Sequence, residues 1–181
     1  SAVLFPEGVV TYVVKGTMGN CTSYDTVVIE TIADEKEGSF NIVPGMNGPY
    51  TNNCATSSIK DPVVPTGSED SGCNTQDGWC KKRSMTNTVW FKLTVPESGT
   101  VSLQAPGDFN NQMALYLYDP LDDSLILLAA NDDYFGLEGN NAAAITGVSD
   151  LEPGSTCYVM VDGGGTGETG ESSLQFMDNP M

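Results

Sequence analysis

The sequence predicts an all-β protein built as an antiparallel β-sandwich or barrel. Three observations support this prediction. Short segments rich in β-branched and apolar residues recur at near-regular spacing, each is bounded by Gly, Pro, Asn or Asp, and no helical period of useful length is present. Many short strands separated by such turns are typical of sandwiches and barrels.

The first predicted element is a pair of strands near the N-terminus. Residues 9–14 and 26–32 are rich in β-branched side chains, and residues 16–23 between them are turn-forming. An isolated hairpin is at best marginally stable in water, so this pair needs other strands, which either precede the chain or come from the main domain. The run Cys-Thr-x-x-Asp-Thr-Val-Val at 21–28 resembles the last two strands of an immunoglobulin-like repeat of bacterial surface proteins, which implies an immunoglobulin-like remnant at 1–33.

The rest of the chain is predicted to divide into a linker and one larger domain. Residues 34–49 are charged and then rich in Pro and Gly, and we interpret them as the linker. Residues 50–83 are polar, with short strand candidates at 55–59 and 63–64. Regular strand signals follow, so we predict the main domain at 50–181. Its further predicted strands lie at residues 89–95, 100–104, 113–118, 125–130, 142–146, 157–162 and 173–176.

Four runs of the main domain carry a resemblance to a known family. They read Asn-Thr-Val-Trp-Phe-Lys-Leu-Thr-Val-Pro-Glu-Ser-Gly-Thr-Val-Ser at 87–102, Met-Ala-Leu-Tyr-Leu-Tyr-Asp at 113–119, Leu-Leu-Ala-Ala-Asn-Asp-Asp at 127–133, and Leu-Glu-Pro-Gly-Ser-Thr-Cys-Tyr-Val-Met-Val-Asp-Gly at 151–163. In this order they resemble the bacterial pre-peptidase C-terminal domain. The resemblance covers roughly residues 50–177, and it implies a jelly-roll sandwich associated with calcium.

The charge of the chain argues against two classes of partner. Seven Lys and Arg residues against 24 Asp and Glu residues give a formal net charge of −17. Nucleic acids and anionic membranes both attract clustered cations, so neither is an expected partner. No apolar run approaches the roughly 18 residues of a membrane-spanning helix, so membrane insertion is not expected either.

The acidic residues predict a calcium site. From Leu93 to the C-terminus the chain has no Lys, Arg or His, and its acids gather in loops beside Asn and Gly. Carboxylates, Asn amides and free backbone carbonyls are the oxygen ligands of Ca²⁺. The competing interpretation is a solvated acidic surface with ordinary strand-ending turns. Resemblance to the calcium-binding collagenase modules of the family favours the metal, and the candidate ligands are Asn131, Asp132, Asp133, Asp119, Asp108 and Asp162.

The five cysteines indicate disulfides, and therefore an extracellular or cell-surface location. Cys73 and Cys80 enclose a short loop, for which we predict a local bridge. Cys54 and Cys157 are left as a long-range bridge. Cys21 is then the odd cysteine, and our preferred account places its partner upstream of the chain.

Catalysis is not expected. The chain contains no His, so it cannot build a Ser-His-Asp or Cys-His site, and it has no Gly-x-Ser-x-Gly elbow. The loop aromatics Trp79, Tyr134 and Phe135 are candidates for stacking on sugar rings, although Trp79 could instead pack over the adjacent disulfide.

These observations predict a non-catalytic extracellular module of a large secreted or cell-surface bacterial protein, stabilised by calcium and engaged in adhesion or ligand binding. The expected partners are neighbouring β domains of the same polypeptide, and surface glycans or other surface proteins. Two alternatives stay open: a carbohydrate-binding module and an accessory C-terminal domain of a secreted peptidase. Asp25-Thr26-Val27 and Asp123-Ser124-Leu125 also resemble the tripeptides at which Bacteroidetes attach O-glycans to exported proteins.

Overall fold

The computed structural model describes residues 9–30, 32–67, 78–79, 84–132, 142–164 and 167–178. The chain forms two compact units, Ser1–Ile32 and Ala33–Met181. Within the described ranges, no helix is long and apolar enough to cross a membrane.

The first unit is a β-hairpin, as the sequence predicted. Strand β1 (Val9–Met18) pairs antiparallel with β2 (Cys21–Glu30), in a register that runs from Val9 opposite Glu30 to Met18 opposite Cys21. The strands are longer than predicted, because pairing continues to a two-residue loop at the tip, where Gly19 has a φ of 60°. A loop of this length closes a hairpin without splaying its strands.

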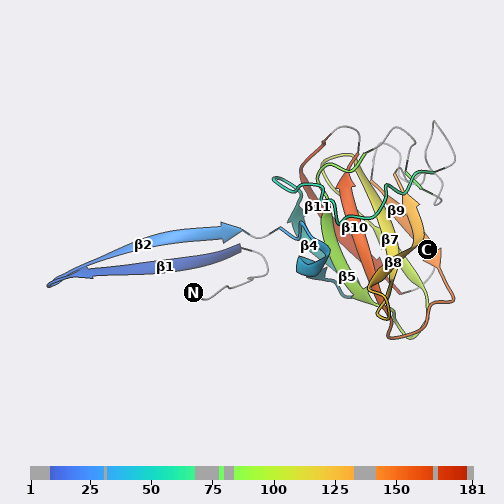
Figure 1. Cartoon of the computed structure of the whole chain (residues 1–181), viewed down its shortest axis with the longest axis horizontal. Helices are drawn as coiled ribbons and strands as arrows, with labels where there is room; N and C mark the ends of the chain where they lie inside the picture. Colours follow the sequence, from blue (N-terminus) through green and yellow to red (C-terminus); the bar gives the residue numbers. More distant parts are fainter. Residues whose placement is uncertain are drawn as a thin grey trace. The chain divides into compact units, whose positions relative to one another are not determined.

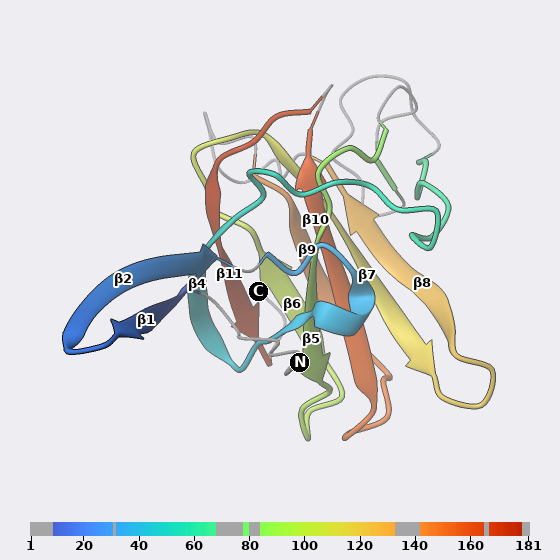
Figure 2. The ribbon, with the colours of Figure 1, turned by 60° about the vertical axis from the view of Figure 1, so that its left-hand side comes forward.

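The second unit is an all-β sandwich, which confirms the predicted fold class (Figures 1 and 2). One sheet has the strand order β3-β5-β10-β7-β8, and the other has the order β4-β11-β6-β9. All neighbouring strands are antiparallel except the short β3, which runs parallel to β5. The bounds are β3 Phe40–Asn41, β4 Gly45–Thr51, β5 Val89–Thr94, β6 Val101–Gln104, β7 Asn111–Asp119, β8 Ser124–Asn131, β9 Ala144–Val148, β10 Thr156–Gly163 and β11 Glu171–Met177, with a short 3₁₀ turn, η1, at Lys36–Gly38.

The five-stranded sheet is buried on both faces over most of its area. In β5, Phe91 and Leu93 point toward the other sheet, while Trp90, the residue before Phe91, points outward into a separate apolar cluster. The ring of Tyr50 on β4 joins the sheets, with its centroid 4.9 Å from that of Phe91. Because both faces are covered, β5 reads as a nearly continuous apolar run.

The predicted linker at 34–49 is wrong, because this segment belongs to the sandwich. Phe40 of β3 pairs with Phe91, and β4 pairs with β11. The sequence hides these strands, because β3 has only two residues and β4 carries two Gly and a Pro. Such residues are tolerated at the edge of a sheet, and β3 and β4 are each an edge strand.

The short strands predicted at 55–59 and 63–64 are absent, and these residues are instead irregular. The backbone of this segment is held by local turns, such as the hydrogen bond from the Ala55 amide to the Asn52 carbonyl at 3.1 Å. Side-chain bonds anchor it to the sheet, including the hydrogen bond from the Trp90 indole of β5 to Asp61 at 3.2 Å. Residues 55–66 thus cover the outward face of the five-stranded sheet, and we call them the covering segment.

The predicted bridge between Cys54 and Cys157 is not formed. Asn87 links the two neighbourhoods of Asp162 and Ala55, donating its amide to the Asp162 carboxylate at 2.6 Å and its side chain to the Ala55 carbonyl at 2.8 Å. Cys54 therefore lies near the Asp162 end of β10, whereas Cys157 lies at the other end, roughly 17 Å away along the strand at about 3.3 Å per residue. A disulfide needs Cα atoms within about 7 Å of each other.

The three cysteines in the described part of the chain are all free. Cys157 is fully buried between the sheets, where desolvation raises its pKa to about 12. Cys21 is exposed beside the hairpin tip. Cys73 and Cys80 lie outside the described residues, so their predicted bridge stays a prediction.

Candidate functional site

The outward face of the five-stranded sheet carries a second apolar cluster. Its members alternate along the strands with the residues that fill the sandwich core, so they share one face of the sheet. Ring contacts link Trp90 to Tyr116 at 6.1 Å and to Tyr158 at 6.5 Å between centroids. The buried members are Trp79, Trp90, Ala114, Tyr116, Ala130 and Met160.

Trp79 fills this cluster instead of presenting a free face. Its side chain is 0% exposed, and its indole N–H donates to the Met113 carbonyl at 2.9 Å. Its backbone bridges to Thr66, which ties it to the covering segment. The expectation that Trp79 stacks on a sugar is therefore corrected, since stacking needs an exposed ring. Tyr134 and Phe135 lie outside the described residues.

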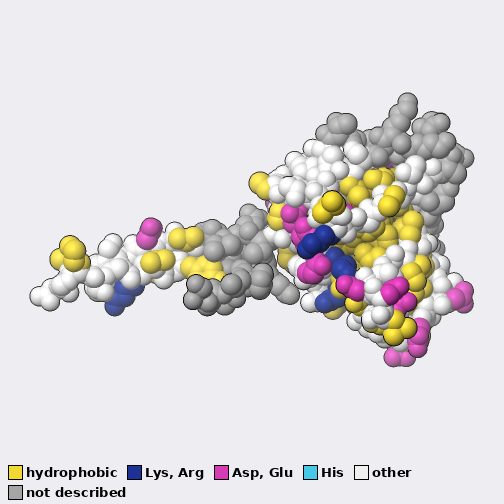
Figure 3. Space-filling model, viewed as in Figure 1, with side chains coloured by type: hydrophobic (Ala, Val, Ile, Leu, Met, Phe, Trp, Pro, Cys, Tyr) yellow, Lys and Arg dark blue, Asp and Glu magenta, His cyan; other side chains and the backbone are white. Residues whose placement is uncertain are grey.

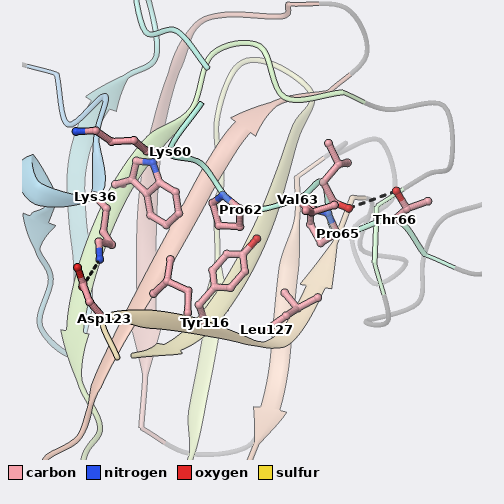
Figure 4. A pocket seen from close by; sticks show the side chains of 12 residues that line it. Lys36, Lys60, Pro62, Val63, Pro65, Thr66, Tyr116, Asp123 and Leu127 are labelled. Carbon is pink, nitrogen blue, oxygen red and sulfur yellow. Dashed lines mark hydrogen bonds and ion pairs between the residues drawn. The ribbon is translucent and has the colours of Figure 1, made fainter. Parts of the chain in front are cut away.

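A hollow of about 650 Å³ opens over the same face of the sheet (Figure 4). One wall is the covering segment, and the other is β8 at the sheet edge. The inner lining comes from β5 and β7. The lining residues are Lys36, Lys60, Pro62, Val63, Val64, Pro65, Thr66, Trp90, Tyr116, Asp123, Leu125 and Leu127.

Deep in this lining, the hydroxyl of Tyr116 is the one polar group that has no hydrogen-bond partner among the described residues. The residue is only 2% exposed. Burial, and then the negative charge of Asp61, raise the pKa of Tyr116 well above its ordinary value. Asp61 itself is engaged elsewhere, accepting from the Trp90 indole at 3.2 Å and from the Ser58 amide at 2.6 Å. The hydroxyl therefore stays protonated and can donate.

Two lysines lie at the rim of the hollow. Lys36 forms an ion pair with Asp123 at 2.9 Å, and its ammonium lies 5.1 Å from the ring centroid of Tyr118 and 5.7 Å from that of Tyr158. The hydrogen bond with Asp123 raises the pKa of Lys36 and lowers that of Asp123. Lys60 has no ion pair within the part of the chain that the structure describes. In the space-filling view, the dark blue side chains visible on the second unit lie close together beside an apolar area (Figure 3).

The predicted calcium ligands do not meet at one point. Asp162 lies near the end of β10, beside the start of β7, whereas Asp119 lies at the far end of β7. At about 3.3 Å per residue, the two are separated by roughly 23 Å along the strand. Asp119 instead closes the turn that follows β7, accepting from the Leu121 amide at 2.9 Å. Asp119 therefore cannot share an ion with Asp162.

Asp162 is fully buried and serves as an anchor for the start of β5. Its carboxylate accepts hydrogen bonds from the Asn87 amide at 2.6 Å, the Gln112 side chain at 2.9 Å and the Thr86 amide at 3.1 Å. Burial still outweighs these donors and raises the pKa of Asp162. Because N–H donors occupy both oxygens, Asp162 does not fit as a calcium ligand.

Three further predicted calcium ligands lie in the described part of the chain. Asp108 accepts from the Glu171 amide at 2.8 Å, and Asn131 accepts from the Ala144 amide at 3.0 Å, so both bind the fold together. Asp132 is fully buried and follows the Met113–Asn131 pair, which places it beside Gln112 of the neighbouring strand. Asp133 lies outside the described residues.

Gln112 is the residue here that fits a cation. Its side-chain N–H group bonds to Asp162 and to the Ser84 carbonyl, which fixes the amide so that its oxygen is buried without a hydrogen-bond partner among the described residues. A neutral amide oxygen is of the type that Ca²⁺ takes. Within the described ranges, however, no three acidic or cysteine side chains lie close enough to hold a metal ion.

No pattern of residues along the chain predicted the hollow. Tyr116 looks like an ordinary strand residue, and Lys36 falls in the segment interpreted as a linker. The one available sign was charge, because Lys36 and Lys60 are two of only seven basic residues in the chain.

Comparison with known proteins adds no further constraint. No protein-family model matches the chain. No curated protein matches it either.

Proposed function

We propose that the chain is a non-catalytic extracellular β-sandwich module of a large secreted or cell-surface protein, where it takes part in adhesion or ligand binding. Its partners are neighbouring β domains of the same polypeptide. The resemblance to the pre-peptidase C-terminal domain and the absence of His from the sequence support the proposal.

The observation that carries the proposal is the exposure of both faces of the hairpin. Val14 and Val27 lie on one face and are 53% and 45% exposed, while Val13 and Tyr24 lie on the other and are each 65% exposed. A two-stranded ribbon with apolar side chains on both faces is marginally stable in water. Other strands must cover it in a stable protein, and the resemblance of this hairpin to the end of an immunoglobulin-like repeat supports strands of the same polypeptide.

Hydrogen exchange tests this proposal. Amides of β1 and β2 should exchange fast in this chain alone and should be protected in the full-length protein that carries it. The amides of β7 and β10 should be protected equally in both and serve as the internal control. Equal exchange of the hairpin amides in the two proteins would contradict the proposal.

The proposal includes a calcium site, with Asp132 and Asp133 as acidic ligands and the Gln112 side-chain oxygen as a neutral ligand. An ion that binds only the folded state stabilises it by about 2.7 kcal/mol at a hundredfold excess over its Kd. We expect thermal melts to show a higher midpoint with calcium than with a chelator, and Asp132→Asn to reduce this difference while Asp119→Asn leaves it. Identical melting midpoints of the wild type with calcium and with a chelator would contradict the proposed calcium site.

A further inference from the structure

The hollow over Tyr116 is built like a ligand site. Its volume of about 650 Å³ falls within the range of pockets that hold small molecules, roughly 300–1,000 Å³. Its walls are apolar side chains from two separate segments, Pro62 to Pro65 on one side and Leu125 and Leu127 of β8 on the other. The part of a ligand that lies between these two walls would contact carbon atoms, so that part should be apolar.

The Tyr116 hydroxyl defines one polar group of that ligand. The hydroxyl lies among the side chains that line the hollow (Figure 4), and no described residue forms a hydrogen bond with it. Buried polar groups in folded proteins are nearly always paired, so an unpaired one beside a hollow calls for an explanation. Because the hydroxyl remains protonated, a ligand oxygen that accepts its hydrogen bond would complete the pairing.

The rim defines the charge of the ligand. Asp123 already neutralises Lys36, but Lys60 makes no ion pair with any described residue, and its side chain is exposed. In a chain with a formal net charge of −17, an unpaired cation beside an apolar hollow is a local exception. Lys60 can turn its ammonium toward an anionic group that protrudes from the hollow.

We propose that this hollow binds a small apolar carboxylate, whose body lies between the covering segment and β8, with an oxygen accepting from Tyr116 and its negative charge near Lys60. The proposal deepens the ligand-binding part of the proposed function. The outcome of its test does not depend on what covers the hairpin or on the parent protein, so the two proposals can fail separately.

The test uses two probes of the same shape and different charge, 4-phenylbutyrate and its neutral amide, 4-phenylbutanamide. Binding to the full chain is measured by ligand-observed NMR and by calorimetry. We expect the carboxylate to bind saturably with a Kd in the millimolar range or tighter, and the amide to bind about fivefold more weakly, the difference that an exposed ion pair provides.

Three variants locate the binding. Lys60→Gln should weaken the carboxylate about fivefold and leave the amide unchanged. Tyr116→Phe, which keeps the ring and removes the hydroxyl, should weaken both probes about fivefold. Leu127→Trp should abolish binding of both by filling the hollow from β8, without disturbing a buried residue, since Leu127 is 43% exposed. Lys15→Gln in the hairpin is the matched charge control and should change nothing.

Several results would overturn the proposal. One is the absence of saturable binding of the carboxylate to the wild-type chain. Another is binding that survives unchanged in Leu127→Trp, which would place the probe elsewhere on the surface. Equal affinity for the two probes, with no effect of Lys60→Gln, would refute the anionic ligand.

Discussion

Two buried polar side chains on the same face of the five-stranded sheet differ in how they are paired. Asp162 accepts hydrogen bonds from N–H donors at both carboxylate oxygens, whereas the Tyr116 hydroxyl has no partner in the part of the chain that the structure describes. A polar group whose hydrogen bonds are complete contributes to the fold and has nothing left to offer a ligand. An acidic side chain is therefore a poor indicator of a ligand site in this protein. A buried polar group without a hydrogen bond, next to a hollow, is a better one.

The largest expected effect is the loss of the Asp162 anchor. Asp162→Ala leaves the Asn87 and Thr86 amides and the Gln112 side chain without an acceptor, so it should lower the free energy of unfolding by about 3 kcal/mol. Urea denaturation measures this change. Asp119→Ala is the control, and it should cost less than about 1 kcal/mol because it loses one bond in a turn. Equal losses in the two variants would show that Asp162 is no more structural than a turn carboxylate.

Removal of the Tyr116 hydroxyl should have the opposite sign. Tyr116→Phe deletes a buried group that has no partner and keeps the ring, so it should raise the free energy of unfolding of the ligand-free protein by about 1 kcal/mol. The same denaturation experiment measures it, with Tyr158→Phe as the control in the same cluster. A loss of stability in Tyr116→Phe would mean that the hydroxyl is paired in solution.

The buried carboxyl of Asp162 should also make the free energy of unfolding depend on pH. Its pKa is raised by burial, so the folded state binds its proton more strongly than the unfolded state, whose Asp pKa is about 3.9. The stability from the protonated acid is fully present below that value and is lost as pH rises through the folded pKa. Denaturation of wild type and Asp162→Asn at pH 3 to 7 should therefore show a wild-type fall with rising pH that the variant lacks. Parallel pH profiles would contradict the raised pKa.

The smallest expected effect concerns the rim of the hollow. The pKa of Asp123 is lowered by Lys36, so the stability from this pair is present above the unfolded pKa and is lost as pH falls through the folded one. Because the Asp123 side chain is 73% exposed, salt should screen the pair. Asp123→Asn should lower the melting midpoint only slightly at neutral pH and low salt, and the difference should vanish at 1 M salt. A difference that persists at high salt would argue for a role of Asp123 in packing.

The positions of the site residues along the chain explain which parts of the site could be predicted from the sequence. The strands at 111–119 and 156–163 were predictable, because apolar residues fill them and Gly, Asn or Asp bound them. The predicted cluster of calcium ligands was not assembled, since Asp119 and Asp162 are placed at opposite ends of paired strands. A sequence shows that both acids flank a strand, but the antiparallel register decides which of them meet.

The all-β class, most strand positions and the hairpin follow from the order of the residues alone, because they depend on local propensity and on alternation along a few residues. The completion of the sandwich by residues 34–49 and the burial of Trp79 follow from tertiary contacts. The same holds for the hollow that Tyr116, Lys36 and Lys60 border. These features depend on contacts between residues far apart in the chain, and no local pattern records which distant segments will cover a given face of a sheet.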